Sequence, residues 1–289
     1  VGSHKAVKLD CAGRSLALDR VAIMGVLNVT PDSFSDGGQY QNVSDAIHHA
    51  QKLVAEGADL IDVGGESTRP GSRGTDAEEE IQRVVPVIRE LVARLAVPIS
   101  VDTSKPEVMT AAVAAGAGLI NDVRALRADG AIEAARALGV PVCLMHMQGK
   151  PETMRDDPHY QDVVREVGDF LQHRVAACAE GGISQQQLLI DPGFGFGKNF
   201  DHNRRLLLEL DALAGLGLPL TVGFSRKGFV GALLGDLNRD RGIGSAGLAL
   251  LAVQKGARVV RAHDVVPTRD LIRSWERLQS VDGHQESFR

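Results

Sequence analysis

Short apolar runs recur along the chain, and each one ends in polar, charged or glycine residues. They occupy residues 22–27, 60–63, 99–101, 119–120, 142–145, 188–190, 220–222 and 259–260. The runs are rich in Val, Ile and Leu and lack polar alternation, which is typical of parallel strands buried on both faces. The pattern therefore predicts parallel β-strands whose polar C-terminal ends meet at one edge.

Amphipathic stretches fill the intervals between these runs. Helix-spaced apolar residues occur over 43–56, 77–95, 106–115, 132–138, 163–179, 203–213, 244–254 and 268–278. This alternation predicts an α/β fold, a (β/α)8 TIM barrel with its chemistry at the strand C-termini. An open doubly wound sheet is disfavoured because no strand is followed by the Gly-x-Gly-x-x-Gly turn of dinucleotide-binding proteins.

Two long irregular segments follow the first two strands. Residues 28–41 and 64–75 are rich in Gly, Ser, Asp, Thr and Pro, and such loops usually serve binding. We expect these two βα loops to lie over the C-terminal face of the barrel. Along the chain we predict an N-terminal extension over 1–20 that begins like an expression-tag remnant, a single barrel domain over 21–280 and a tail over 281–289.

Composition and charge narrow the function classes. No apolar run approaches the length of a membrane span, and the N-terminus lacks the apolar segment of a signal peptide. The net charge of −5 gives no general basic surface for nucleic acid, and the three cysteines form no Cys-x-x-Cys pair. We expect a cytoplasmic protein that binds neither nucleic acid nor membrane and holds any anionic ligand in a local cluster.

Motifs in series along the chain resemble those of the dihydropteroate synthase family of folate biosynthesis. The two longest are GVLNVTPDSFSDGG at 25–38 and DVGGESTRPG at 62–71. The others are SVDT at 100–103, IND at 120–122, MHM at 145–147, DPGFGF at 191–196, SRK at 225–227 and RAH at 261–263. The resemblance implies a homodimeric transferase of an alkyl group other than methyl, a sulfonamide target. Its small-molecule substrates would be 6-hydroxymethyl-7,8-dihydropterin diphosphate and p-aminobenzoate, giving 7,8-dihydropteroate and diphosphate.

Four polar residues at strand ends suit a pterin ring, whose amino edge needs acceptors and whose carbonyl needs a donor. The resemblance implies that Asp191 accepts from the 2-amino and N3 edge and that Asn121 holds the amino side. Asp102 would approach the other ring edge, and Lys227 would donate to the carbonyl and ring nitrogen. The further pterin contacts it implies are Met145, Val123 and Gly223.

The diphosphate needs positive charge and hydrogen-bond donors. The resemblance implies that Asn28, Arg69, Arg261 and His263 bind it, with Asn28 as the protein ligand of the cofactor Mg²⁺. An amide oxygen is a suitable hard ligand for that ion, although Asn28 taken alone is more simply a turn residue. The catalytic residues that the resemblance implies are Lys227, Arg261, His263 and Asp36.

The second substrate would be framed by residues of the loops. The implied aminobenzoate contacts are Phe34, Thr68, Arg69, Pro70, Phe196 and Gly228. Many members of the family carry a serine where this chain has Gly228, so we expect a backbone N–H to meet the aminobenzoate carboxylate. Because the aniline nitrogen is already neutral at pH 7, we expect no strong base and a dissociative, SN1-like substitution with water excluded.

Several features of the sequence allow two interpretations. His146 either faces the pocket floor or is a satisfied structural histidine, and Arg226 either meets substrate or, as we favour, anchors its own loop. A C-terminal apolar stripe, Leu271, Ile272, Trp275 and Leu278, either forms a dimer surface or covers the barrel. Competing functions are methyl transfer from methyltetrahydrofolate to a corrinoid protein and a non-catalytic subunit role. The motifs at 28–38, 225–227 and 261–263 disfavour methyl transfer, and the intact loops and anion-binding residues disfavour a non-catalytic role.

Overall fold

The computed structural model describes residues 7–30, 39–66, 74–149, 154 and 157–279. Parallel strands close into a barrel in the order β10-β3-β4-β5-β6-β7-β8-β9, as the sequence predicts. Their bounds are β3 Ala22–Asn28, β4 Leu60–Gly64, β5 Ile99–Asp102, β6 Leu119–Asp122, β7 Val142–Met145, β8 Leu188–Asp191, β9 Leu220–Val222 and β10 Ala257–Ala262. Most strands extend through the polar residue that ends the apolar run, so these polar side chains belong to the barrel wall.

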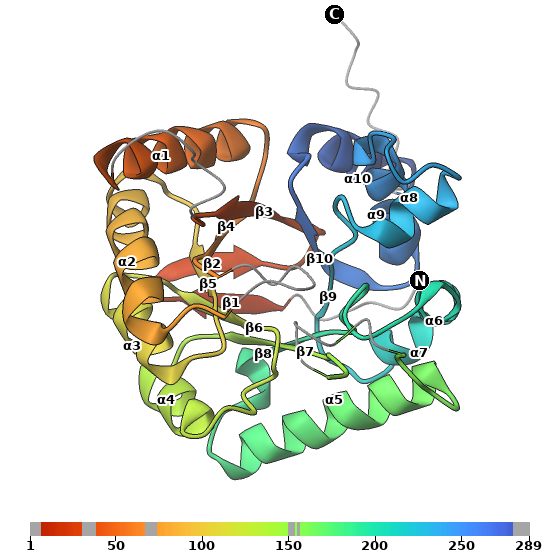
Figure 1. The fold of residues 1–289 in the computed structure, drawn as a ribbon, viewed down its shortest axis with the longest axis horizontal. Helices are drawn as coiled ribbons and strands as arrows, with labels where there is room; N and C mark the ends of the chain where they lie inside the picture. The colour runs from red at the N-terminus through yellow and green to blue at the C-terminus, as the bar shows by residue number, and fades with distance from the viewer. Residues whose placement is uncertain (1–6, 31–38, 67–73, 150–153, 155–156, 280–289) are drawn as a thin grey trace, which may run out of the picture.

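Helices surround the strands as a ring (Figure 1). They are α1 Gln39–Ala55, α2 Ala77–Arg94, α3 Pro106–Ala114, α4 Ala131–Leu138, α5 Val163–Glu180, α6 Phe200–Leu208, α7 Asp211–Ala214, α8 Gly228–Leu233, α9 Gly242–Gln254 and α10 Val265–Gln279, with a 3₁₀ turn η2 at Gln185–Gln187. The single helix predicted over 203–213 is wrong, because the chain breaks between α6 and α7 while the apolar spacing continues. Helix α8 was not predicted, since two glycines among its six residues weaken its helical pattern.

The segment predicted as an N-terminal extension contains a β-hairpin formed by β1 (Lys8–Cys11) and β2 (Arg14–Ala17). Ala12 and Gly13 both have positive φ, 54° and 81°, which suits a two-residue hairpin turn. The apolar residues of the hairpin and of the barrel interior form one cluster: Leu9, Cys11, Leu16, Leu18, Ala22, Met24, Leu60, Leu119, Cys143, Leu189 and Val259. The hairpin therefore packs against the interior at the N-terminal ends of the strands.

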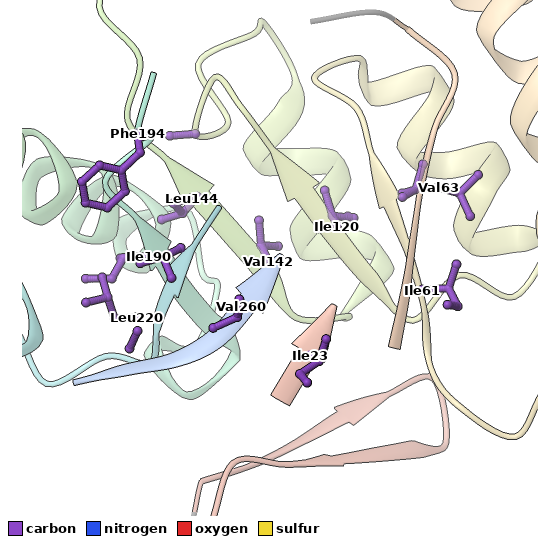
Figure 2. Close-up of a cluster of buried hydrophobic side chains, with 14 of the residues drawn as sticks. Ile23, Ile61, Val63, Ile120, Val142, Leu144, Ile190, Phe194, Leu220 and Val260 are labelled. Carbon is purple, nitrogen blue, oxygen red and sulfur yellow. The ribbon is translucent and has the colours of Figure 1, made fainter. Parts of the chain in front are cut away.

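Side chains alternate between the two faces of the barrel wall. Ile61, Ile120, Val142 and Val260 lie in the buried layer between strands and helices, which Figure 2 shows in close-up. Their neighbours in sequence face inward, and the last inward positions of the strands lie at the C-terminal end. Those positions are Asn28, Gly64, Asp102, Asn121, Met145, Asp191, Gly223 and Arg261. The barrel thus brings most of the predicted site together.

The predicted C-terminal stripe divides between two environments. Ile272 is fully buried and Trp275 packs against the core, whereas the side chain of Leu278 is 82% exposed. The buried half of the stripe covers the barrel, as one of the two interpretations expected. Among the described residues, we find no helix with the length and apolar character needed to span a bilayer.

Candidate active site

A pocket opens at the C-terminal end of the barrel. Its lining residues are Asp102, Asn121, Val123, Met145, Asp191, Phe196, Gly223, Ser225, Lys227, Arg261 and His263. All but Ser225 were singled out from the sequence. They come from β5 to β10 and the loops that follow these strands, so the closure of the barrel gathers residues that are distant in sequence.

Arg261, in the pocket wall, pairs with two carboxylates, Asp102 in the lining and Asp62 behind it. Arg261 Nε donates to Asp62 Oδ2 over 2.6 Å, and Arg261 Nη2 donates to Asp102 Oδ2 over 2.9 Å. Asn121 Nδ2 donates to the same Asp62 oxygen over 3.1 Å. The sequence analysis did not give Asp62 a role. Its signal was an acidic residue at an inward position within a buried apolar run, where an unpaired charge is not tolerated.

Burial displaces the pKa of the charged groups in the pocket. It raises the pKa of Asp102 to about 7, although the neighbouring Arg261 lowers it. Burial also lowers the pKa of Lys227 to about 8, partly offset by Asp191. The pKa of Asp191 is likewise raised by burial, against the opposing charge of Lys227. The pocket therefore holds groups whose charges are poorly solvated before a ligand arrives.

The loop after β8 is held against the loop after β7 by a buried lysine. Lys198 Nζ lies 2.9 Å from His146 Nδ1 and donates to the carbonyl oxygens of Gly193 and Phe196, each over 3.0 Å. Burial, followed by the charge of Lys198, lowers the pKa of His146 to about 2, so the imidazole is neutral. His146 is accordingly a structural histidine, one of its two interpretations. Lys198 was not predicted, although it lies two residues after the DPGFGF motif.

His263 is oriented by the serine of the SRK motif. Ser225 Oγ lies 2.8 Å from His263 Nδ1 and accepts from the His263 backbone N–H over 3.0 Å. The next residue, Arg226, has φ of +58° and pairs with Asp264 through Nε and Nη2 at 3.1 and 2.6 Å. Arg226 thus anchors its own loop, as we favoured. Lys227 Nζ donates to the carbonyl of Phe194 over 2.5 Å.

Asn28 lies at the end of β3, on the rim of the barrel. Its Oδ1 and the carboxylate of Asp102 both flank Gly64, within 3.6 and 3.7 Å of where a Cβ on that glycine would stand. The described residues contain no group of three His, Cys, Asp or Glu side chains that could hold a metal ion. A single amide oxygen nevertheless fits Mg²⁺, which commonly binds through one or two protein oxygens with water and phosphate oxygens completing its shell.

Five predicted site residues lie outside the described part of the chain: Phe34, Asp36, Thr68, Arg69 and Pro70. The described residues that flank 67–73 are tied to each other. Glu66 Oε1 accepts from the Thr75 N–H over 2.8 Å, and Lys105 Nζ donates to Glu66 Oε2 over 2.6 Å. Lys105 also donates to the fully buried Glu80 over 2.5 Å. This network was not predicted, because its members lie on three separate segments.

Gly228 is the first residue of α8, directly after Lys227. A Cβ built on Gly228 meets no atom within 4 Å, so open space surrounds this position among the described residues. Phe196 lies beside Lys227, whose Nζ is 4.6 Å from the centre of the Phe196 ring. The two predicted aminobenzoate contacts that the structure describes therefore adjoin the same lysine.

Comparisons with known proteins place the chain in a family. A model described as "Pterin binding enzyme" matches residues 24–263. The dihydropteroate synthase of Escherichia coli K12 is 49% identical over 275 residues, covering 95% of this chain and 98% of the relative. That of Neisseria meningitidis serogroup C is 49% identical over 273 residues, covering 92% and 96%.

Solved structures of dihydropteroate synthases also match this chain. Xanthomonas albilineans dihydropteroate synthase with 4-aminobenzoic acid matches with a TM-score of 0.91 and 53% identity, covering 96% of this chain and all of that one. The same enzyme in complex with 7,8-dihydropteroate matches at 0.87 and 51%, covering 95% and 100%. The chain belongs to the dihydropteroate synthases, the pterin-binding transferases of folate biosynthesis.

Proposed function

We propose that this pocket joins 6-hydroxymethyl-7,8-dihydropterin diphosphate to p-aminobenzoate by an SN1-like substitution at the exocyclic carbon of the pterin. The observation that carries the proposal is the convergence of Asp102, Asn121, Asp191, Lys227 and Arg261 on one buried pocket. Carboxylate, amide and ammonium groups together match the donor and acceptor edges of a pterin. The Xanthomonas albilineans relative was solved with 4-aminobenzoic acid and with 7,8-dihydropteroate, which are the proposed second substrate and product.

The pterin would lie on the inward side chains at the strand ends. Asp191 would accept from the 2-amino and N3 edge, and Lys227 would donate to the carbonyl and ring nitrogen. Asp191 is already held by the Gly193 N–H, which donates to its Oδ1 over 2.7 Å and leaves Oδ2 for the ligand. Met145 and Val123, both buried in the pocket wall, would contact the ring through apolar atoms.

The diphosphate would lie toward Asn28, Arg261 and His263. Arg261 is held through Nε and Nη2 by its two carboxylates, and His263 is held at Nδ1 by Ser225. Bound Mg²⁺ would neutralise charge on the departing diphosphate, with Asn28 Oδ1 as its protein ligand. Because the aniline nitrogen needs no base, the protein would act by stabilising the leaving group and excluding water from the carbocation.

The aminobenzoate would lie over Phe196 with its carboxylate at the Gly228 backbone N–H. A Yersinia pestis relative was solved with a sulfonamide drug, at 49% identity and a TM-score of 0.89. We propose that sulfonamides compete for the same subsite here. The roles of Phe34, Asp36, Thr68, Arg69 and Pro70, a homodimer and a cytoplasmic location stay predictions of the sequence.

A two-substrate assay tests the proposed function, with Asp102→Ala, Asp191→Ala and Lys227→Ala as variants. Each substitution removes a buried charge-assisted contact. We therefore expect each folded variant to lose about 2–4 kcal/mol of transition-state stabilisation, measured as a lower kcat/KM. Near-normal turnover in two of the three would contradict the assignment. An inactive wild-type protein would favour the non-catalytic alternative, and methyl transfer from methyltetrahydrofolate would favour the corrinoid alternative.

Substrate order provides a separate test. The aminobenzoate subsite is expected to include the two long loops, so it should be incomplete until pterin, Mg²⁺ and diphosphate bind. Calorimetric titration of aminobenzoate should detect weak binding alone and much tighter binding with the other three present. Equal affinity under both conditions would mean that the subsite is preformed.

A further inference from the structure

Asp62 lies directly behind the pocket without lining it. Its side chain is fully buried, and it occupies the inward position of β4 two residues before the strand ends at Gly64. One oxygen, Oδ2, accepts from both Arg261 and Asn121. Both of these residues do line the pocket, so Asp62 contacts two candidate ligand-binding groups from the side that faces away from the ligand.

The bond to Asn121 fixes the direction of that amide. An ionised carboxylate only accepts hydrogen bonds, so the end of Asn121 that faces Asp62 must be its NH₂ group. The carbonyl oxygen of Asn121 is then the end left for the pocket. A pterin presents N–H donors on its amino side, and a ring with oxygen in place of the 2-amino group presents an acceptor there. In the proposed function the Asp191 carboxylate already favours the amino ring, and the direction of the Asn121 amide adds to that preference.

The bond to Arg261 fixes the guanidinium at a second point. Nε is held by Asp62 and Nη2 by Asp102, which lie on the neighbouring strands β4 and β5. Two bonds to separate carboxylates define the plane of the guanidinium, which one bond alone would leave free to swing. The same Asp62 oxygen thus sets the orientation of an acceptor and of a cation.

Asp62 is poorly suited to a purely stabilising role. Its second oxygen, Oδ1, is buried and has no hydrogen-bond partner among the described residues. A buried carboxylate with an unsatisfied oxygen is unfavourable, and apolar replacements of buried ion pairs are often as stable or more so. An acidic residue at this position is explained by what its bonds do to Asn121 and Arg261.

We propose that Asp62 is a positioning residue that makes the site select a 2-amino pterin, by turning the Asn121 oxygen toward the ligand and fixing the plane of Arg261. This inference rests on the proposed function, in which Asn121 holds the amino side of the pterin. It adds a residue behind the pocket that sets specificity without touching substrate.

The test compares two ligands, 6-hydroxymethylpterin and 6-hydroxymethyllumazine, in which an oxygen replaces the 2-amino group of the pterin. We define selectivity as the ratio of their dissociation constants, measured by calorimetry. Asp62→Ala should lower selectivity about tenfold, because the Asn121 amide can then rotate to suit either ring. Asp62→Asn keeps an oxygen where Arg261 and Asn121 donate, so it should retain selectivity within about twofold. Unchanged selectivity in folded Asp62→Ala would overturn the proposal.

Thr221→Val is the matched control. Thr221 lies inside the barrel, paired with Val259 two residues before Arg261, and its buried hydroxyl also lacks a partner among the described residues. Selectivity should not change in this variant. A loss there equal to that of Asp62→Ala would show that any change in the interior disturbs the pocket, and would overturn a specific role for Asp62.

A measurement on the wild-type protein keeps the proposal testable if Asp62→Ala does not fold. NMR with ¹⁵N-labelled asparagine can follow the Asn121 side-chain amide, whose signal is assigned as the one lost in Asn121→Ala. One of its NH₂ protons should exchange slowly with solvent both with and without pterin. Protection that appears only with pterin would mean that the NH₂ faces the ligand, against the proposal. If Asn121→Ala itself keeps full selectivity, the proposed role of Asn121 fails. If Asn121→Ala loses selectivity and Asp62→Ala does not, only the role of Asp62 fails.

Discussion

The close approach of the loops after β7 and β8 offers a sharp test of how the pterin site is held. Gly193 has φ of +66°, and a Cβ built on it would lie 1.9 Å from the carbonyl oxygen of His146. An alanine at this position must therefore adopt the left-handed region. It must also push the segments after β7 and β8 apart by more than about 1 Å. The segments that separate carry Met145 on one side and Asp191 on the other.

The size of the effect follows from the bonds at this contact. Left-handed backbone costs alanine about 1–2 kcal/mol. The shift also stretches the bond from the His146 N–H to the Asp191 carbonyl, now 2.9 Å, and disturbs the bond from the Gly193 N–H to the Asp191 carboxylate, now 2.7 Å. Hydrogen bonds contribute about 1 kcal/mol each, and those to charged groups about 1.5–3 kcal/mol. We expect a total loss of about 3–6 kcal/mol.

Gly217→Ala separates the backbone term from the close approach. Gly217 has φ of +78° and no atom within 4 Å of a built Cβ, so this variant loses only the left-handed term. At roughly 2–4 °C per kcal/mol for a chain of this size, Gly217→Ala should lower Tm by a few degrees with normal kcat/KM. Gly193→Ala should lower Tm by roughly 10 °C and kcat/KM for the pterin substrate by about 100-fold, since a displacement near 1 Å in a site has that effect.

Differential scanning calorimetry and steady-state kinetics on the two variants decide the matter. Equal losses of Tm, with normal activity in both, would refute the reasoning, because the contact between Gly193 and His146 would then not support the site. A normal Tm with lost activity would also count against it. The predicted mechanism requires both, since the same backbone contact holds the fold locally and positions Asp191.

Three further outcomes are expected. Asp102 must be ionised to hold Arg261, and Lys227 must be protonated to donate a hydrogen bond. The value of kcat/KM for the pterin substrate should therefore rise with pH through about 7 and fall above about 8. Lys227→Arg should remove the fall at alkaline pH, and a flat profile from pH 6 to 9 would contradict both assignments. Gly228→Ser places a hydroxyl in open space beside the proposed carboxylate site, so KM for aminobenzoate should fall about threefold to tenfold in steady-state assays with pterin affinity unchanged. Ser225→Ala removes the contact at His263 Nδ1, which should lower kcat about tenfold with little change in pterin affinity by calorimetry. A normal kcat would show that His263 does not depend on this contact.

The barrel was predictable because its strands carry a strong local signal. Most apolar runs end where the barrel interior becomes the pocket, so the end of the run marks both the strand and the candidate site residue. Asp102, Asn121 and Asp191 all follow this rule. Their assembly in one pocket then follows from the closure of a parallel barrel.

The support behind the site was not predictable by the same rule. Asp62 stands inside an apolar run, and its partner Arg261 is 199 residues away in sequence. Lys198 reaches back to His146 across 52 residues. Such contacts depend on strand register and loop geometry, which sequence spacing does not record. The N-terminal hairpin was missed for a related reason, since its short strands gain their stability by packing into the barrel interior.

The barrel interior changes character along its axis, and this change explains the charged state of the site. At the hairpin end it is filled by apolar side chains, which offer no polar atoms to the groups above them. Burial consequently raises the pKa of Asp102 and Asp191 and lowers that of Lys227. A ligand that donates to the acids and accepts from the lysine would replace the solvation that folding removed. Under the proposed function, the apolar interior favours pterin binding because it leaves the polar rim in need of hydrogen-bond partners.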